Sequence, residues 1–138
     1  MNTLYFIWGL PSAGKSTLAQ ELALRFCCYH HEADHYMLDS EGNYSFDVDK
    51  LYFCHEACFA AASKDLEEGS DTIVSNTSTT EKEVEKYQEL AAYFGARFVS
   101  IIVENRHGNS SVHNVPELTM DKMRKRFSVQ LWREGLCV

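Results

Sequence analysis

The chain has 138 residues, of which 45% are hydrophobic and 24% are charged, and its formal net charge is −7. This length and apolar content predict one domain over residues 1–138, with a substantial core and no room for a second domain. The first residues carry no basic segment, and no apolar run is long enough to span a bilayer. We therefore expect a cytoplasmic protein without a signal peptide or membrane contact.

The charge is unevenly distributed along the chain. Residues 1–103 carry 7 basic and 16 acidic side chains, whereas residues 104–138 carry 6 basic and 4 acidic ones. The positive last quarter could hold a polyanion, or it could be the solvated face of a helix. The acidic whole argues against strong non-specific binding to nucleic acid.

The first predicted elements frame a glycine-rich motif. Residues 4–8 form an apolar run typical of a buried strand, and a helical pattern begins at Ser16. The motif between them reads G-x-x-x-x-G-K-S, the sequence of a phosphate-binding loop, in which Lys15 reaches the β and γ oxygens and the Ser16 hydroxyl ligates Mg²⁺. We predict that ATP and Mg²⁺ bind at Gly9, Leu10, Pro11, Ser12, Ala13, Gly14, Lys15, Ser16 and Thr17.

The middle of the chain continues the alternation of strands and helices. We predict a second strand over residues 28–33 that delivers Asp34 at its end, and a turn over residues 42–45. A long helix then begins at Asp47 or Asp49 and stops near Gly69. His55 falls on its apolar face, where we expect a core histidine that is hydrogen-bonded to the backbone.

The second half of the chain repeats the pattern. Residues 72–75 form a short third strand, and a capping-box spacing from Thr80 to Glu83 opens a helix that runs to Gly95. Residues 98–103 form a fourth strand, residues 104–114 a polar loop, and Pro116 opens a last helix. This alternation predicts an α/β protein of three layers, in which a short parallel sheet of about four strands carries helices on both faces.

Polar side chains follow the predicted strands, and the carboxyl ends of parallel strands share one edge. Lys15 would neutralise phosphate charge, Asp34 would accept the proton of an acceptor hydroxyl, and Arg106 would stabilise charge in the transition state. Asn76 and Thr77 would lie near the γ-phosphate or a Mg²⁺-bound water. No acidic residue follows the third strand, where a second magnesium-binding carboxylate is common.

The cysteines allow a different interpretation. Five cysteines without disulfide-framework spacing indicate free thiols in a reducing compartment. Two groups of cysteines and histidines nevertheless cluster in the sequence, which leaves open a metal-binding structural module. These groups are Cys27, Cys28, His30 and His31, and Cys54, His55 and Cys58.

Several motifs in order resemble those of the small P-loop kinases related to bacteriophage polynucleotide 5′-kinase and their eukaryotic Nedd-binding relatives. They are the phosphate loop, E-A-D-H-Y at residues 32–36 for the family's D-A-D-H-Y, His55-Glu56-x-Cys58, V-S-N-T-S-T at residues 74–79 for V-D-N-T-N-T, Glu83 with Tyr87, and V-H-N-V-P at residues 112–116 for V-H-G-V-P. The resemblance implies a kinase-like fold, Asp34 as the base or acceptor-binding carboxylate, and Asn76 and Thr77 near the nucleotide phosphates.

The chain departs from that family at two places. Ser75 replaces the aspartate before Asn76, and Ser110 and Ser111 stand in a shortened lid where relatives carry Arg-Asn. Two functions therefore stay open. One is an ATP-dependent kinase acting on a hydroxyl, such as the 5′-hydroxyl of a polynucleotide or nucleoside, or a small metabolite. The other is a nucleotide-dependent binding module or ATPase without an acceptor.

Overall fold

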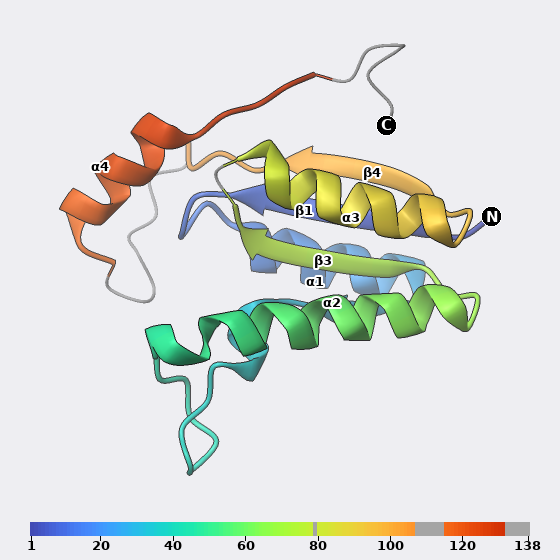
Figure 1. Cartoon of the computed structure of the whole chain (residues 1–138), viewed down its shortest axis with the longest axis horizontal. Helices are drawn as coiled ribbons and strands as arrows, with labels where there is room; N and C mark the ends of the chain where they lie inside the picture. The colour runs from blue at the N-terminus through green and yellow to red at the C-terminus, as the bar shows by residue number, and fades with distance from the viewer. Residues whose placement is uncertain (79, 107–114, 132–138) are drawn as a thin grey trace.

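The fold is built on one parallel sheet, whose strands β4, β1 and β3 lie next to one another in Figure 1. The computed structural model describes residues 1–78, 80–106 and 115–131. The strands run in the order β2-β3-β1-β4, and Trp8 and Gly9 at the end of β1 lie opposite Asn76 and Thr77 of β3. Their bounds are β1 Thr3–Gly9, β2 Tyr29–His31, β3 Thr72–Thr77 and β4 Arg97–Ile102.

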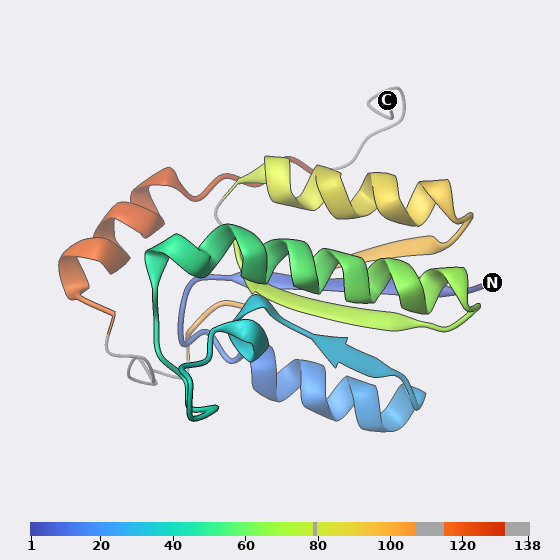
Figure 2. The same ribbon diagram turned by 60° about the horizontal axis from the view of Figure 1, so that its bottom comes forward.

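Helices cover both faces of this sheet, as Figure 2 shows. One face packs against α1, the other packs against α2 and α3, and α4 lies beyond the carboxyl ends of the strands (Figure 1). The predicted three-layer α/β architecture is therefore confirmed. The helices are α1 Lys15–Phe26, α2 Leu51–Glu67, α3 Glu81–Tyr93 and α4 Glu117–Arg126, and two short 3₁₀ turns are η1 Ala33–Tyr36 and η2 Val48–Lys50.

The unbroken apolar sequence of β1 reflects its central place in the sheet. Side chains alternate between the two faces of a strand, so Phe6 and Trp8 point toward α2 and α3 while Ile7 points toward α1. Phe6 stacks on Tyr87 of α3 with ring centroids 4.8 Å apart. A strand that is buried on both faces favours apolar residues at successive positions, and residues 4–8 of β1 form such a run.

The structure moves several predicted boundaries. The second strand is shorter than predicted, because the chain turns into η1 and places Asp34 inside a 3₁₀ turn rather than at a strand end. The third strand is longer, so Asn76 and Thr77 belong to β3 instead of following it. The long helix begins at Leu51, after η2. Thr80 precedes α3 but its side chain makes no capping hydrogen bond.

Three smaller expectations can also be compared with the structure. The Nδ1 atom of His55 is buried without a hydrogen-bond partner among the described residues, so this atom does not make the expected bond to the backbone. Phe127 lies just after α4 and stacks on Trp8. The cysteines of the described part are free thiols. Over the same residues, no helix combines the length and apolar character that crossing a membrane requires.

Candidate nucleotide and phosphotransfer site

The phosphate loop joins the end of β1 at Gly9 to the start of α1 at Lys15. A side chain on Gly9 would collide with the carbonyl oxygen of Val103, which follows the adjacent strand β4. Gly14 precedes the helix with a φ of 99°, a backbone conformation that glycine adopts without the steric cost of a Cβ. Both glycines of the motif are thus required by the path of the backbone. The loop leaves the first N–H groups of α1 facing the carboxyl edge of the sheet.

Lys15 lies beneath this loop and is largely buried. Its side chain is 8% exposed, and its Nζ donates a 2.7 Å hydrogen bond to the Leu10 carbonyl across the loop. Burial lowers the pKa of Lys15 to about 8, against the opposing influence of Glu32 and Asp34. A buried cation of this kind gains from an anionic ligand, because a phosphate would restore the favourable charge environment that burial removes.

Glu32, to which sequence reasoning gave no role, is the carboxylate nearest to the magnesium-binding position of the motif. It follows β2, and its Oε2 accepts hydrogen bonds of 2.7 Å from the Ser16 hydroxyl and 2.9 Å from the Ser75 hydroxyl. The third strand lacks an acidic residue, as the sequence indicated. Glu32, which directly follows the neighbouring strand β2, supplies a carboxylate at this position instead. The signal was present in the E-A-D-H-Y motif, whose first residue is acidic.

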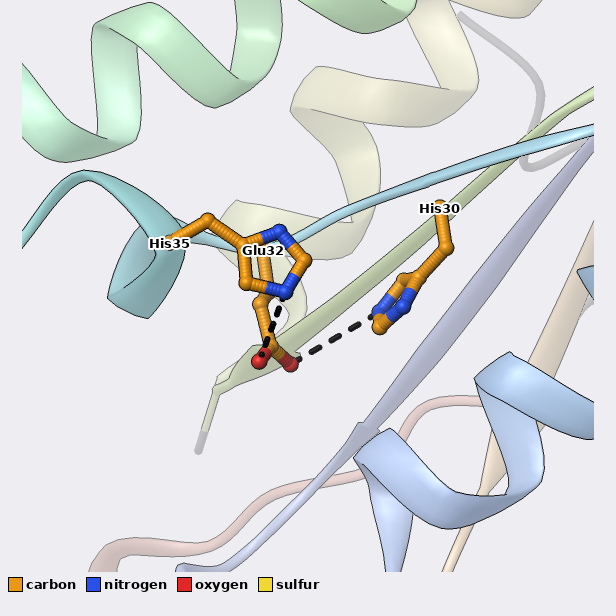
Figure 3. Close-up of side chains that lie close together, drawn as sticks. All are labelled: His30, Glu32 and His35. Atoms are coloured by element: carbon orange, nitrogen blue, oxygen red, sulfur yellow. Dashed lines mark ion pairs between the residues drawn. The ribbon is translucent and has the colours of Figure 1, made fainter.

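Two histidines flank the Glu32 carboxylate, as Figure 3 shows. The Nε2 atom of His35 lies 3.2 Å from Oε1, and the Nε2 atom of His30 lies 3.6 Å from Oε2. Burial alone would raise the pKa of Glu32, but hydrogen bonds from His35, Ser16 and Ser75 outweigh it and lower the pKa to about 2. The same bond raises the pKa of His35, whereas burial lowers the pKa of His30. Glu32 is therefore a fixed negative charge at neutral pH.

Asn76 holds the chain that carries Asp34. Its Oδ1 accepts a 2.9 Å hydrogen bond from the Ala33 backbone N–H, and its Nδ2 lies 3.7 Å from the Cys58 sulfur on the α2 side of the sheet. Asp34 is exposed in η1, and its negative charge opposes the lowering of the Lys15 pKa by burial. Asn76 thus supports η1 from below, and its predicted contact with phosphate stays a prediction.

Thr77 ends β3 beside Gly9, and Arg106 lies four residues beyond the end of β4. Thr77 is exposed, pairs with Gly9 across the sheet, and belongs by alternation to the face of β3 that Ser75 shares with Glu32. Arg106 is 83% exposed and its Nε donates a 3.0 Å hydrogen bond to Glu104. The remaining lid residues, 107–114, which include Ser110 and Ser111, lie outside the described residues.

The donor set fits the ligands that the motif predicts. A serine hydroxyl joined to a carboxylate offers the hard oxygen atoms that Mg²⁺ prefers, and a helix N-terminus with a lysine below it suits polyphosphate. Ser16 and Glu32 would hold the cation, directly or through water. The cation would supply charge neutralisation to the phosphates.

The cysteine and histidine groups of the sequence do not converge in the described part of the chain. His30 and His31 are adjacent in β2 and therefore point to opposite faces. His31 bonds Asp65 at 2.6 Å, whereas His30 bonds Ser75 at 2.6 Å. Neither cysteine group appears among the clusters of metal-ligating side chains, and the cluster found there consists of His30, Glu32 and His35.

A parallel sheet whose central strand ends in a G-x-x-x-x-G-K-S loop, with a lysine and a serine–carboxylate pair at its carboxyl edge, defines a P-loop nucleotide-binding protein of the kinase-like fold. Residues 4–129 match the family model AAA_33, described as an AAA domain. The chain belongs to this family.

Solved structures share the fold at low sequence identity. A sugar kinase from Janibacter sp. HTCC2649 matches with a TM-score of 0.62 and 12% identity, over 95% of this chain and 80% of its own. A candidate kinase from Chloroflexus aurantiacus J-10-fl matches with a TM-score of 0.61 and 20% identity, over 74% of this chain and 59% of its own. A Pnkp1/Rnl/Hen1 complex matches with a TM-score of 0.61 and 15% identity, over 98% of this chain and 42% of that one. The chain thus spans less than two thirds of the length of the last two.

Proposed function

We propose that this protein is an ATP-dependent kinase that transfers the γ-phosphate to a hydroxyl acceptor, such as a polynucleotide or nucleoside 5′-hydroxyl. The observation that carries the proposal is the hydrogen bond from Ser16 to Glu32. Asp34 comes two residues after Glu32 in the sequence. This segment would then carry two carboxylates with different roles: Glu32 would hold the cation of the nucleotide, and Asp34 would face the acceptor. Both are close enough to Lys15 to influence its pKa.

Each residue then has a separate part in the transfer. Lys15 and the N–H groups of the loop bind and orient the phosphates. Asp34 accepts the proton of the acceptor hydroxyl as its oxygen forms the new bond to phosphorus, and ADP leaves as the bond to its terminal oxygen breaks. Arg106 stabilises the negative charge that develops on the transferred group. Mg²⁺, when bound, would neutralise charge on the phosphate oxygens.

The class of acceptor is open between a nucleic acid end and a small molecule. Two structural neighbours support these two classes of acceptor: one is a Pnkp1/Rnl/Hen1 complex, and another is called a sugar kinase. The acidic net charge of −7 favours a small or uncharged acceptor over a long polyanion, because like charges repel at long range.

The test is a screen of hydroxyl acceptors with γ-labelled ATP. We expect label to appear on one class of acceptor, and ATP consumption to rise strongly when that acceptor is added. The matched control is Lys15→Ala, which removes the buried cation below the loop and should abolish transfer. Label on no acceptor, with ATP turnover unchanged by every compound, would contradict the kinase proposal.

A nucleotide-dependent binding module or ATPase is the second candidate. The pairing of the exposed Arg106 with Glu104 favours it, because this contact supplies no cation to the phosphates. Such a protein would bind ATP with the same dependence on Lys15, but its turnover would be slow or independent of any acceptor. The same screen therefore separates the two functions.

A further inference from the structure

The Glu32 carboxylate of the nucleotide site also belongs to a second group of side chains that could bind a metal ion. His30 on β2 and Glu32 just after it lie on one face of the strand, and η1 brings His35 back against them (Figure 3). One ligand atom from each residue, two imidazole nitrogens and a carboxylate oxygen, lies within 4.8 Å of the others. The side chains of His30 and Glu32 are 8% and 15% exposed, so the group forms a partly enclosed site with one open side at His35.

The spacing of these atoms is close to that of a coordination sphere. Ligands at roughly 2.0–2.1 Å from a tetrahedral zinc ion lie about 3.3 Å from one another. The separations from Glu32 are 3.2 Å to His35 and 3.6 Å to His30, each measured to the nearer carboxylate oxygen. Because the ligand atoms lie within 4.8 Å of one another, rotation of the carboxylate and of the exposed imidazole would have to bring one atom of each residue to that distance.

The types of ligand select among metals. Two imidazoles and a carboxylate suit zinc and similar transition metals, whereas Mg²⁺ prefers a shell made of oxygen atoms. Outer partners are also in place, because the Ser16 and Ser75 hydroxyls both donate to Glu32 and fix its orientation. A three-ligand site of this kind leaves a fourth position for water.

We propose that His30, Glu32 and His35 form a binding site for Zn²⁺, and that zinc and the magnesium–nucleotide complex compete for Glu32. Zinc would be held by the Nε2 atoms of both histidines, each bound as a neutral imidazole with its remaining proton on Nδ1. A neutral histidine would move its proton from Nε2 to Nδ1, and a histidine protonated at both nitrogens would release one proton to solvent. The metal would draw the carboxylate away from Ser16. The zinc-bound protein is then a form with a weakened nucleotide site.

Zinc binding itself is measured on the full chain with Zn²⁺ alone, by competition with a chromophoric chelator in excess Mg²⁺. We expect the wild type to bind one equivalent of zinc, and His35→Gln to bind it with an affinity at least about 100-fold lower. This loss exceeds the roughly 10–100-fold effect of removing an outer partner of a metal ligand. His35 is 44% exposed, so this variant should fold, and His30→Gln gives a second, independent reading. His55→Gln and Cys27→Ser are matched controls outside the group and should bind zinc like the wild type.

X-ray absorption at the zinc edge identifies the ligands directly. We expect nitrogen and oxygen neighbours at about 2.0–2.1 Å and no sulfur at about 2.3 Å. A sulfur shell would place the metal on the cysteines and overturn the proposal. Zinc affinity that is unchanged in both His30→Gln and His35→Gln would overturn it as well.

Competition is measured by magnesium–nucleotide binding before and after one equivalent of zinc. We expect zinc to lower the affinity at least about tenfold in the wild type and to change it little in His35→Gln, since a ligand that two sites share couples them reciprocally. Equal nucleotide affinity in the zinc-bound wild type would refute competition. The zinc titration needs no nucleotide, so its result is independent of whether the protein is a kinase.

Discussion

The Ser16 hydroxyl donates a 2.7 Å hydrogen bond to the Glu32 carboxylate, although the two residues lie 16 positions apart on different elements. Ser16 stands in the first turn of α1, whereas Glu32 follows β2, which is an edge strand and does not pair with β1. The contact forms because Glu32 and the phosphate loop lie on the same side of the sheet. It joins the loop to the segment that carries Asp34.

Glu32→Gln tests the magnesium role of this contact. The amide keeps the shape of the side chain but removes its charge, so the Mg²⁺ concentration needed for half-maximal nucleotide binding should rise roughly 10–100-fold, the usual effect of losing a metal-site partner. A titration with a fluorescent ATP analogue measures it. Ser75→Ala is the control, because it removes one hydrogen bond to Glu32 and keeps the charge. An unchanged Mg²⁺ requirement in Glu32→Gln would exclude Glu32 from the magnesium site.

Acid unfolding should reveal the same carboxylate. The pKa of Glu32 falls from its ordinary value of 4.5 to about 2 in the folded protein. A depressed pKa stabilises the folded state above pH 4.5, and this contribution is lost as the pH falls toward 2; the shift corresponds to about 3 kcal/mol.

Urea unfolding at a series of pH values between 2 and 6 measures this contribution, as the difference between the wild type and Glu32→Gln. Other carboxylates titrate in both proteins and largely cancel. The difference in the free energy of unfolding between the wild type and Glu32→Gln should decrease as the pH falls. His35 acts in the opposite sense, because its raised pKa stabilises the folded state at low pH and is lost as the pH rises. A difference that does not vary with pH would show that Glu32 is not stabilised in its charged form.

Gly9→Ala tests the packing of the phosphate loop. The added methyl group would collide with the Val103 carbonyl oxygen, which is backbone and cannot turn away. Gly42→Ala is a matched control, since Gly42 also has a positive φ but its Cβ would meet no atom within 4 Å. We expect Gly42→Ala to cost roughly 1–2 kcal/mol and Gly9→Ala to cost about 1–3 kcal/mol more. Equal unfolding free energies for the two variants would mean that the loop relaxes freely.

Asp34→Asn separates binding from chemistry. The substitution should preserve ATP affinity and lower phosphate transfer roughly 10²–10⁴-fold, the usual contribution of a positioned general base. Asp39→Asn is a control in the same acidic segment, because Asp39 caps its own turn through the Glu41 and Asn43 N–H groups. Normal transfer by Asp34→Asn would make Asp34 a structural residue.

The sequence predicted the sheet, its helices and the loop because each depends on local patterns. The apolar run of β1 and the G-x-x-x-x-G-K-S motif need no knowledge of distant residues. The partner of Ser16 could not be predicted in the same way, because it depends on which side of each strand a residue occupies. Ser75 and Asn76 are neighbours in β3, yet one bonds Glu32 beside the loop and the other bonds the backbone of η1 near α2. A boundary error of one residue in β2 or β3 exchanges such roles.

Arg106 provides the sharpest test of the kinase proposal, because it is the arginine in the stretch from residue 104 to residue 114. Its exposed ion pair with Glu104 costs little to break, since such pairs contribute about 0–1 kcal/mol. If the guanidinium stabilises the transition state, Arg106→Ala should lower kcat strongly with little change in ATP affinity. Arg106→Lys should restore little, because an ammonium group lacks the two-pronged geometry. Glu104→Gln is the matched control: it frees Arg106 without removing it and should keep kcat near or above the wild-type value. A wild-type kcat in Arg106→Ala would leave this stretch without a catalytic cation and would favour the nucleotide-dependent binding module.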